Sequence, residues 1–214
     1  MLLSIKIRVK IWPMIKLIAG LGNPGFRFKK TRHNFGFLVL DSLARNNQAV
    51  FMMKKDFNSL LAKINLNGQI ILATKSQTMM INSGQAIKKI SQYYKIKPQE
   101  IMVIHDDFDI GFNQMKFGFG RSSASHKGAE SIIQHLGTKN FFRLRLGIKP
   151  EKELKMPLEK FVLEKFNKQE RLALPLVIKK AAEIISAAVS YAIETPDQLV
   201  NQLHNQFNLS ISAL

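Results

Sequence analysis

Two polar side chains with hydrolytic potential flank a predicted strand-to-helix turn near the start of the chain. The apolar run at residues 15–19 predicts a strand, and apolar residues at helical spacing from Phe35 to Leu43 predict a helix. Asn23 and His33 lie between them. In open α/β sheets, ligands gather at the carboxyl ends of strands. An amide and an imidazole at this bend therefore predict a site, although each residue on its own could serve only the turn or the helix start.

A carboxylate for the imidazole follows a second predicted strand. Residues 101–104 are fully apolar, which is typical of a buried central strand, and the run ends in His105-Asp106-Asp107. If the two strands are neighbours, Asp106 and His33 lie at one edge of the sheet. A carboxylate bound to one ring nitrogen fixes the tautomer and leaves the other nitrogen to take a proton from water. This pair predicts a hydrolytic base.

Covalent and metal-assisted chemistry are less favoured by the sequence. The chain has no cysteine and no Gly-x-Ser-x-Gly motif, which favours direct attack by water over a covalent nucleophile. His105, His126 and His135 show no ligand spacing such as His-Glu-x-x-His. We therefore expect neither a metal nor another cofactor.

Charge and composition set the outer bounds. The 214 residues, 46% of them hydrophobic, are enough to bury one substantial core. The 32 Lys and Arg against 15 Asp and Glu give a net charge of +17. This excess points to an anionic partner, and nucleic acid, an anionic membrane surface and a merely solubilising surface all stay open. Without cysteines for disulfides, the cytoplasm is the simplest compartment.

The chain is expected to form one domain over residues 14–207. Residues 1–13 mix Lys6, Arg8 and Lys10 with apolar residues, so they contain neither a signal-peptide core nor a membrane span. We predict that they are a flexible extension or precede the true start at Met14, and that residues 208–214 form a tail. Asn67-Gly68 between two strand-like runs predicts a hairpin. The carboxyl third is predicted to be helical, with breaks near Pro175 and Pro196.

Five motifs follow one another along the chain: Gly22-Asn23-Pro24-Gly25, Thr31-Arg32-His33-Asn34, Asn82-Ser83-Gly84, His105-Asp106-Asp107-Phe108-Asp109 and Arg143-Leu144-Arg145-Leu146-Gly147-Ile148. In their order and spacing they resemble the bacterial peptidyl-tRNA hydrolase family. The resemblance spans roughly residues 14–206. It implies a single α/β domain whose mixed, twisted sheet has helices on both faces, and a metal-free monomer that cleaves the ester joining a peptide to the 3′ end of tRNA.

The resemblance also implies roles for particular residues. His33 looks like the catalytic base, Asp106 the acid that holds it, and Asn23 the residue that separates blocked from free aminoacyl groups. An amide suits that task because it can bond the substrate's own peptide group. Substrate contacts are implied for Met79. They are also implied for Phe28, Ile81, Asn82 and Lys127, which lie where this chain departs from the family pattern.

Three positions depart from the family pattern. Phe28 replaces a tyrosine and keeps a ring for stacking. Ile81 takes the place of an asparagine that is displaced to Asn82, and one residue turns a helical side chain by roughly 100°. Lys127 replaces an amide in Ser125-His126-Lys127-Gly128. Lys127 either pairs with the tRNA backbone or points to solvent.

Recognition of tRNA phosphates is expected from basic residues in one third of the chain. The family's phosphate clamp uses a lysine, whose position falls here on Gly118, and an arginine that matches Arg145. Lys116 would have to reach instead. Arg143 and Arg145 alternate on one strand face, so both could meet phosphate, or the face could simply be solvated.

Two functions from different classes remain. The first is an esterase that hydrolyses peptidyl-tRNA, which the retained Asn23, His33 and Asp106 favour. The second is a catalytically impaired RNA-binding protein on the same scaffold. The loop at residues 121–127 favours it, because Arg121-Ser122-Ser123-Ala124 stands where the family has a glycine-rich loop and Lys127 replaces an amide.

Overall fold

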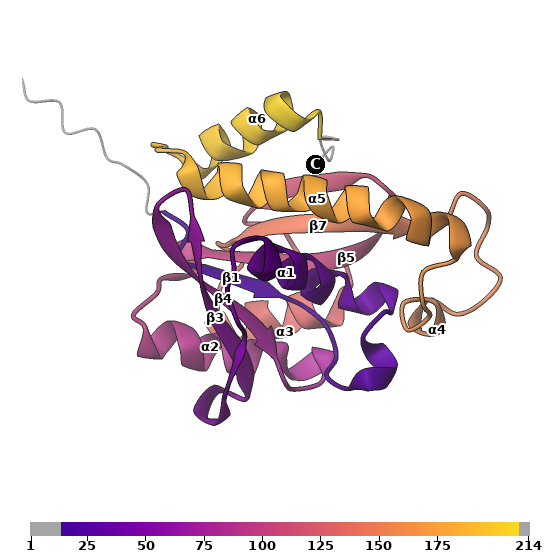
Figure 1. Ribbon diagram of the computed structural model, residues 1–214, viewed down its shortest axis with the longest axis horizontal. Coiled ribbons are helices and arrows are strands. Elements are labelled where there is room, and N and C mark those ends of the chain that lie inside the picture. The colour runs from indigo at the N-terminus through magenta and orange to yellow at the C-terminus, as the bar shows by residue number, and fades with distance from the viewer. Residues whose placement is uncertain (1–13, 210–214) are drawn as a thin grey trace, which may run out of the picture.

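A seven-stranded mixed sheet forms the centre of the molecule in the computed structural model (Figure 1), which describes residues 14–209. The predicted extension at residues 1–13 and most of the predicted tail, residues 210–214, lie outside the described residues. The strands are β1 (Leu17–Gly20), β2 (Met52–Lys54), β3 (Ser59–Leu66), β4 (Gln69–Ser76), β5 (Ile101–Gly111), β6 (Met115–Phe119) and β7 (Phe142–Lys149). Their spatial order is β2-β3-β4-β1-β5-β7-β6.

The middle of the sheet is parallel and its margins are antiparallel. β1 pairs in parallel with β4 and β5, and β5 pairs in parallel with β7. β2, β3 and β6 join in antiparallel pairs. The prediction of a mixed sheet is confirmed, and the parallel strands bring their carboxyl ends to a common edge.

Helices cover both faces of this sheet, as expected. They are α1 (Phe35–Asn46), α2 (Ser83–Tyr93), α3 (Lys127–Leu136), α4 (Leu158–Phe161), α5 (Lys168–Ser190) and α6 (Pro196–Phe207). α1 and α5 pack with the larger apolar cluster on one face, where α6 also lies, and α2 and α3 pack with the smaller cluster on the other (Figure 1). The short α4 lies beside one end of the sheet.

The hairpin signal at Asn67-Gly68 is confirmed. These two residues join β3 to β4, and both have positive φ, 52° at Asn67 and 86° at Gly68. Two-residue hairpin loops need such angles because they match the twist of the strands, and Asn and Gly adopt them at low cost.

Two predicted boundaries are wrong. β5 does not stop at Ile104 but continues to Gly111, so Asp106 lies within the strand. Its neighbour β1 ends opposite Ile104, and beyond that point β5 stays paired with β7. Helix α5 runs through Pro175 without a break. The proline removes one backbone hydrogen bond and crowds the Arg171 carbonyl, but the packed second half holds the helix. The break at Pro196 is confirmed, since α6 begins there.

A buried ion pair ties α5 to the turn that precedes α1. Arg32 donates from Nη2 to Glu170 Oε2 at 2.7 Å and from Nε to Oε1 at 3.3 Å. Arg32 and Glu170 are 4% and 5% exposed, so neither charge is solvated. The Arg32 guanidinium also lies 4.1 Å from the centre of the Phe161 ring. This pair holds the residue next to His33.

Removing one partner of this pair should destabilise the fold strongly. We expect Arg32→Met to lower the free energy of unfolding by about 3 kcal/mol, because Glu170 is left buried and uncompensated. The double variant Arg32→Met/Glu170→Gln should recover part of this loss. Urea unfolding measures both, with the exposed Arg45→Met as control. A loss below about 1 kcal/mol would mean that the pair is not a structural tie.

Candidate active site

The site lies where β1 ends, as the sequence predicts. Asn23 and Asn34 close the intervening loop with two hydrogen bonds: Asn23 N donates to Asn34 Oδ1, and Asn34 Nδ2 donates to Asn23 O, both at 2.9 Å. His33 lies in the 3-10 helix Arg32–Asn34, and its backbone N–H donates to Val162 O at 2.8 Å. The loop therefore holds Asn23 and His33 in fixed positions.

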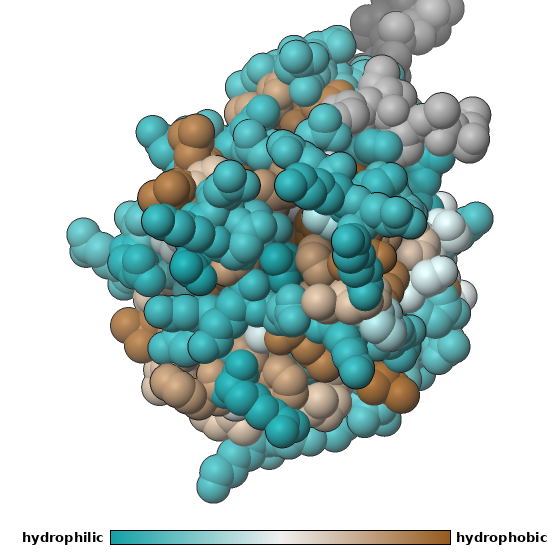
Figure 2. All heavy atoms as spheres, turned by 90° about the vertical axis from the view of Figure 1, so that its right-hand side faces the viewer, coloured by the Kyte–Doolittle hydropathy of each residue, from teal (hydrophilic) through white to brown (hydrophobic). Residues whose placement is uncertain are grey.

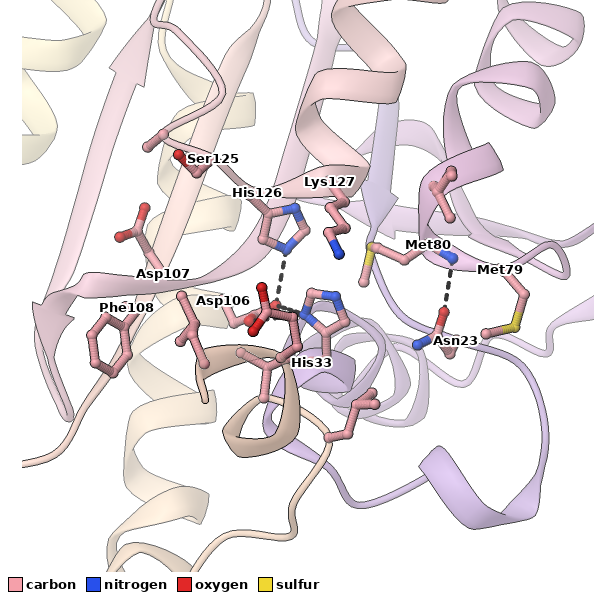
Figure 3. Close-up of a pocket in the computed structure, with 16 residues that line it drawn as sticks. Asn23, His33, Met79, Met80, Asp106, Asp107, Phe108, Ser125, His126 and Lys127 are labelled. Carbon is pink, nitrogen blue, oxygen red and sulfur yellow. Dashed lines mark hydrogen bonds and ion pairs between the residues drawn. The ribbon is translucent and has the colours of Figure 1, made fainter. Parts of the chain in front are cut away.

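Asp106 bridges two histidines (Figure 3). His33 Nδ1 lies 3.1 Å from Asp106 Oδ1 and 3.0 Å from Oδ2, while His126 Nε2 lies 3.1 Å from Oδ1. The expected juxtaposition of His33 and Asp106 is present. The second imidazole, His126, has no role in the sequence prediction. Its place directly before a helix, which begins at Lys127, was the available signal.

Backbone contacts settle the tautomer of His126. It is the N-cap of α3, and its Nδ1 accepts hydrogen bonds from the N–H groups of Gly128 and Ala129, each at 3.2 Å. An accepting Nδ1 carries no proton in the neutral ring, so Nε2 does, and Nε2–H donates to Asp106. Asp106 also accepts from His33 Nδ1–H, which leaves His33 Nε2 as the nitrogen that can take a proton.

The electrostatics favour an ionised carboxylate. Burial would raise the pKa of Asp106, yet the charges and hydrogen bonds of His33 and His126 hold that pKa well below its usual range. The neighbouring His105 is fully buried, and desolvation, with His126 and Arg143 nearby, lowers its pKa well below the usual value. His105 therefore stays neutral and donates from Nδ1 to the Asp106 carbonyl at 2.7 Å.

His33, Asp106 and His126 fit a proton network better than a metal site. Ligand atoms of His33, Asp106 and His126 lie within 4.8 Å of one another, close enough to consider a cation. A metal on His126 Nε2 would move the ring proton to Nδ1, where it would oppose the two backbone N–H donors of α3. The helix cap thus disfavours metal ligation.

Asn23 presents its amide nitrogen to the cavity. Its Oδ1 accepts a hydrogen bond from Met80 N at 2.7 Å, so the carbonyl end is already used (Figure 3). Asn23 is 4% exposed. The remaining group, Nδ2, is a donor, so Asn23 can form hydrogen bonds only with acceptor groups of a ligand.

A cavity of about 260 Å³ connects these side chains. The carboxyl third supplies one wall that the sequence prediction missed, from in and around α4: Leu158, Glu159, Val162 and Leu163. On the side of the molecule that carries α4, apolar atoms lie between hydrophilic ones (Figure 2). The cavity is largely apolar with a few polar groups, as is usual for ligand sites.

The predicted substrate contacts divide into two groups. Met79, Ile81 and Lys127 line the cavity, and Lys127 extends toward it from the start of α3 (Figure 3). Asn82 is absent from the lining, as the one-residue displacement implies. Phe28 needs correction: it is 9% exposed, does not line the cavity, and packs beneath the Arg27 guanidinium at 4.5 Å. Its ring is not presented to a ligand.

The basic residues of β6 and β7 also need one correction. Arg143 and Arg145 share a face as predicted, but Arg143 is 1% exposed and its three guanidinium nitrogens have no hydrogen-bond partner. Burial, with the charge of Arg145, lowers its pKa to about 10, so it remains a cation near neutral pH. Arg143 therefore does not reach solvent.

The outward cations on this face lie near Gly118. Lys116 pairs across the sheet with Arg145, whose Nε donates to Asp107 at 2.6 Å. Gly118 leaves room for the Arg121 side chain, whose Cγ would lie 3.4 Å from a Cβ at that position. The exposed Arg121 therefore occupies the space above the residue that matches the family's lysine.

A carboxylate-oriented histidine in an apolar cavity at the strand ends of an α/β sheet is the arrangement of a hydrolase that activates water with a general base. Comparison with known proteins supports this class and narrows it. Residues 17–209 match the family model for peptidyl-tRNA hydrolase. The chain belongs to the peptidyl-tRNA hydrolase family.

Individual relatives agree over nearly their whole length. Peptidyl-tRNA hydrolase of Aquifex aeolicus is 38% identical over 192 residues, covering 88% of this chain and 97% of that protein. The Mycolicibacterium smegmatis protein of the same name is 35% identical, covering 86% and 96%. A crystal structure of peptidyl-tRNA hydrolase from Acinetobacter baumannii has a TM-score of 0.80 at 30% identity, covering 91% and 94%.

The ionised state of Asp106 makes acid stability a test of the site. A carboxylate whose pKa is lowered in the folded state stabilises the fold above its unfolded pKa and loses that effect as the pH falls. We expect Asp106→Asn to be clearly less stable than wild type near neutral pH. The difference should shrink by about 1.4 kcal/mol per pH unit below about pH 4. Urea unfolding across this range measures it. A difference independent of pH would contradict an ionised Asp106.

Proposed function

We propose that this protein hydrolyses the ester bond between the peptide and the tRNA of peptidyl-tRNA, with a water activated by His33. The observation that carries the proposal is the contact of His33 Nδ1 with the buried Asp106 carboxylate at 3.0 Å, beside a cavity that also contains Asn23. The family of the chain and the names of its relatives support the same substrate.

The proton transfers follow from the tautomers. His33 Nε2 takes a proton from water as the oxygen attacks the ester carbonyl carbon, and Asp106 stabilises the imidazolium that forms. The tetrahedral intermediate then breaks its bond to the ribose oxygen, which receives the proton from His33. The products are a free carboxylate and tRNA with a free hydroxyl. No covalent intermediate with the protein is needed.

Asn23 supplies selectivity for a blocked amine. With Oδ1 engaged by Met80 N, its free Nδ2–H₂ is a donor. A donor can bond the carbonyl oxygen of a peptide group, but it has nothing to offer the ammonium of a free aminoacyl group, which is also a donor. The amide therefore favours peptidyl over aminoacyl esters.

Binding of the RNA falls to the exposed or partly exposed cations near the cavity. We assign phosphate contacts to Lys116, Arg121 and Arg145, and leave out the buried Arg143 and the cavity-lining Lys127. Arg and Lys at such places neutralise phosphates without reading bases, which suits recognition of all tRNAs. The non-catalytic alternative is not favoured, because RNA binding alone needs no histidine bound to a buried carboxylate.

The setting of this activity is also proposed. None of the described helices is long and apolar enough to cross a membrane. The substrate is made during translation, so we infer action in the cytoplasm. One chain contributes all the side chains named above, so a monomer suffices.

Loss of the base should abolish most of the activity. We expect His33→Ala to lower kcat by about 10²- to 10⁴-fold on N-acetyl-aminoacyl-tRNA, because a positioned general base contributes that much. Release of the blocked amino acid from purified protein measures it. His135→Ala, in the last turn of α3 and outside the cavity lining, is the matched control and should keep full activity. Equal rates for wild type and His33→Ala would refute the enzymatic function.

The two departures in the cavity wall should also be measurable. If Ile81 and Lys127 cost activity, Ile81→Asn and Lys127→Asn should each raise kcat/KM on the same substrate. Each variant would restore a side-chain amide at a position of the cavity wall where the family pattern has one. We expect increases of a few-fold. Unchanged values in both variants would show that the remaining lining compensates, and Gln134→Asn serves as the control beside them.

A further inference from the structure

A protrusion at residues 25–30 carries an exposed aromatic ring among cations. We propose that Phe26 stacks on an unpaired base of the single-stranded 3′ end of the RNA, while Arg27, Lys29 and Lys30 contact the adjoining phosphates. This inference rests on the proposed function for its ligand, and it adds a contact that family membership does not supply.

Phe26 has no role in the packing of the fold. It is 93% exposed, whereas Phe28, two residues on, is 9% exposed and packed. The structure thus offers to a ligand a different ring from the one that the sequence predicted. A fully exposed ring contributes nothing to the core and forfeits the gain of burial. Its position calls for a partner.

The protrusion is held rigidly. Gly25 begins it at φ 102°, with open space on the side where a side chain would be. Phe28 N donates to Gly25 O at 3.2 Å, Lys29 N to Phe26 O at 3.3 Å, and Thr31 Oγ1 to Phe28 O at 2.8 Å. A fixed ring loses little conformational entropy when a base stacks on it.

Its charge selects an anionic ligand. Arg27, Lys29 and Lys30 are all exposed, and the sequence holds no acidic residue between Ile15 and Leu40. Basic side chains that follow a phosphate backbone, combined with aromatic rings that stack on bases, are the means by which proteins bind single strands without reading sequence. A peptide partner would not need three cations around one ring.

Its location selects the end of the RNA. The protrusion begins two residues after Asn23 and ends three residues before His33, and both of these side chains line the cavity. The loop thus connects two cavity residues, while Phe26 itself does not line the cavity, so the ring would meet a nucleotide outside the cavity and not the ester. The nucleotides nearest to that ester are the unpaired ones at the 3′ end.

Direct binding tests the proposal without any need for turnover. In a Trp12→Phe background, Phe26→Trp places the only tryptophan on the protrusion. Its fluorescence should be quenched by a short oligoribonucleotide ending in CCA, and less by an oligomer of the same length with abasic sites. Quenching by anionic lipid vesicles and not by the oligonucleotide would overturn the proposal in favour of a membrane surface.

Kinetics give the second measurement. Phe26→Ala and Phe26→Leu should raise KM for N-acetyl-aminoacyl-tRNA roughly tenfold with kcat nearly unchanged, and Phe26→Tyr should keep the wild-type KM. Tyr93→Ala removes another exposed ring, at the end of α2, and should change neither value. A wild-type KM in Phe26→Leu would show that the ring does not stack.

The two proposals fail separately. If wild type hydrolyses the ester but Phe26→Ala matches it, only the stacking contact is wrong. If the oligonucleotide quenches Phe26→Trp while wild type is no faster than His33→Ala, only the enzymatic function is wrong.

Discussion

A buried, ionised carboxylate between two imidazoles is the interaction on which the site depends. Asp106 is 2% exposed, so water does not solvate its charge, and the N–H groups of His33 and His126 replace that solvation. The three residues come from three different segments of the chain. Each of these segments must therefore be positioned by the fold before the carboxylate can be stable as an anion.

Close packing supplies that positioning. Gly36, at the start of α1, lies so near the strand ends that a Cβ there would be 2.3 Å from Ile104 O and 2.5 Å from Leu21 N. Only glycine, which has no Cβ, allows α1 to approach β1 and β5 this closely. Arg32 and Glu170 hold the preceding turn from the other side. Between these two constraints, His33 has little freedom to move away from Asp106.

The sequence predicts most of the sheet because the periodic patterns are local. Asn67-Gly68 specifies its hairpin, and the apolar run before Asp106 identifies a buried strand. The pairing of Asp106 with His33 could be predicted because β1 and β5 are neighbours: His33 follows the end of β1, and Asp106 lies on β5 just past the point where β1 ends. The length of β5 could not, since it depends on continued pairing with β7 after β1 has ended.

Side-chain direction and long-range contacts were beyond the sequence. His126 joins the site only because α3 begins beside β5, and α4 walls the cavity although it lies more than 50 residues further along the chain than Asp106. Phe26 and Phe28 are alike in the sequence, and only the 3-10 turn between them decides which ring is exposed. Arg143 and Arg145 share a face, yet Arg143 is fully buried while Arg145 is partly exposed and bonded to Asp107.

The departures from the family pattern leave this centre intact. Phe28, Ile81 and Lys127 all lie outside the hydrogen bonds that join Asp106 to its two histidines. Ile81 and Lys127 lie in the walls of the cavity, where they can change affinity and orientation. The geometry of the base itself is set by the sheet and by the cap of α3.

The tautomers of the two histidines test this account most directly. A nitrogen-detected NMR spectrum of histidine-labelled protein, above the pH at which the rings are protonated, reports which nitrogen of each ring carries the proton. The account predicts a proton on Nδ1 of His33 and on Nε2 of His126. A proton on Nε2 of His33 would contradict it, because that nitrogen could then not accept a proton from water.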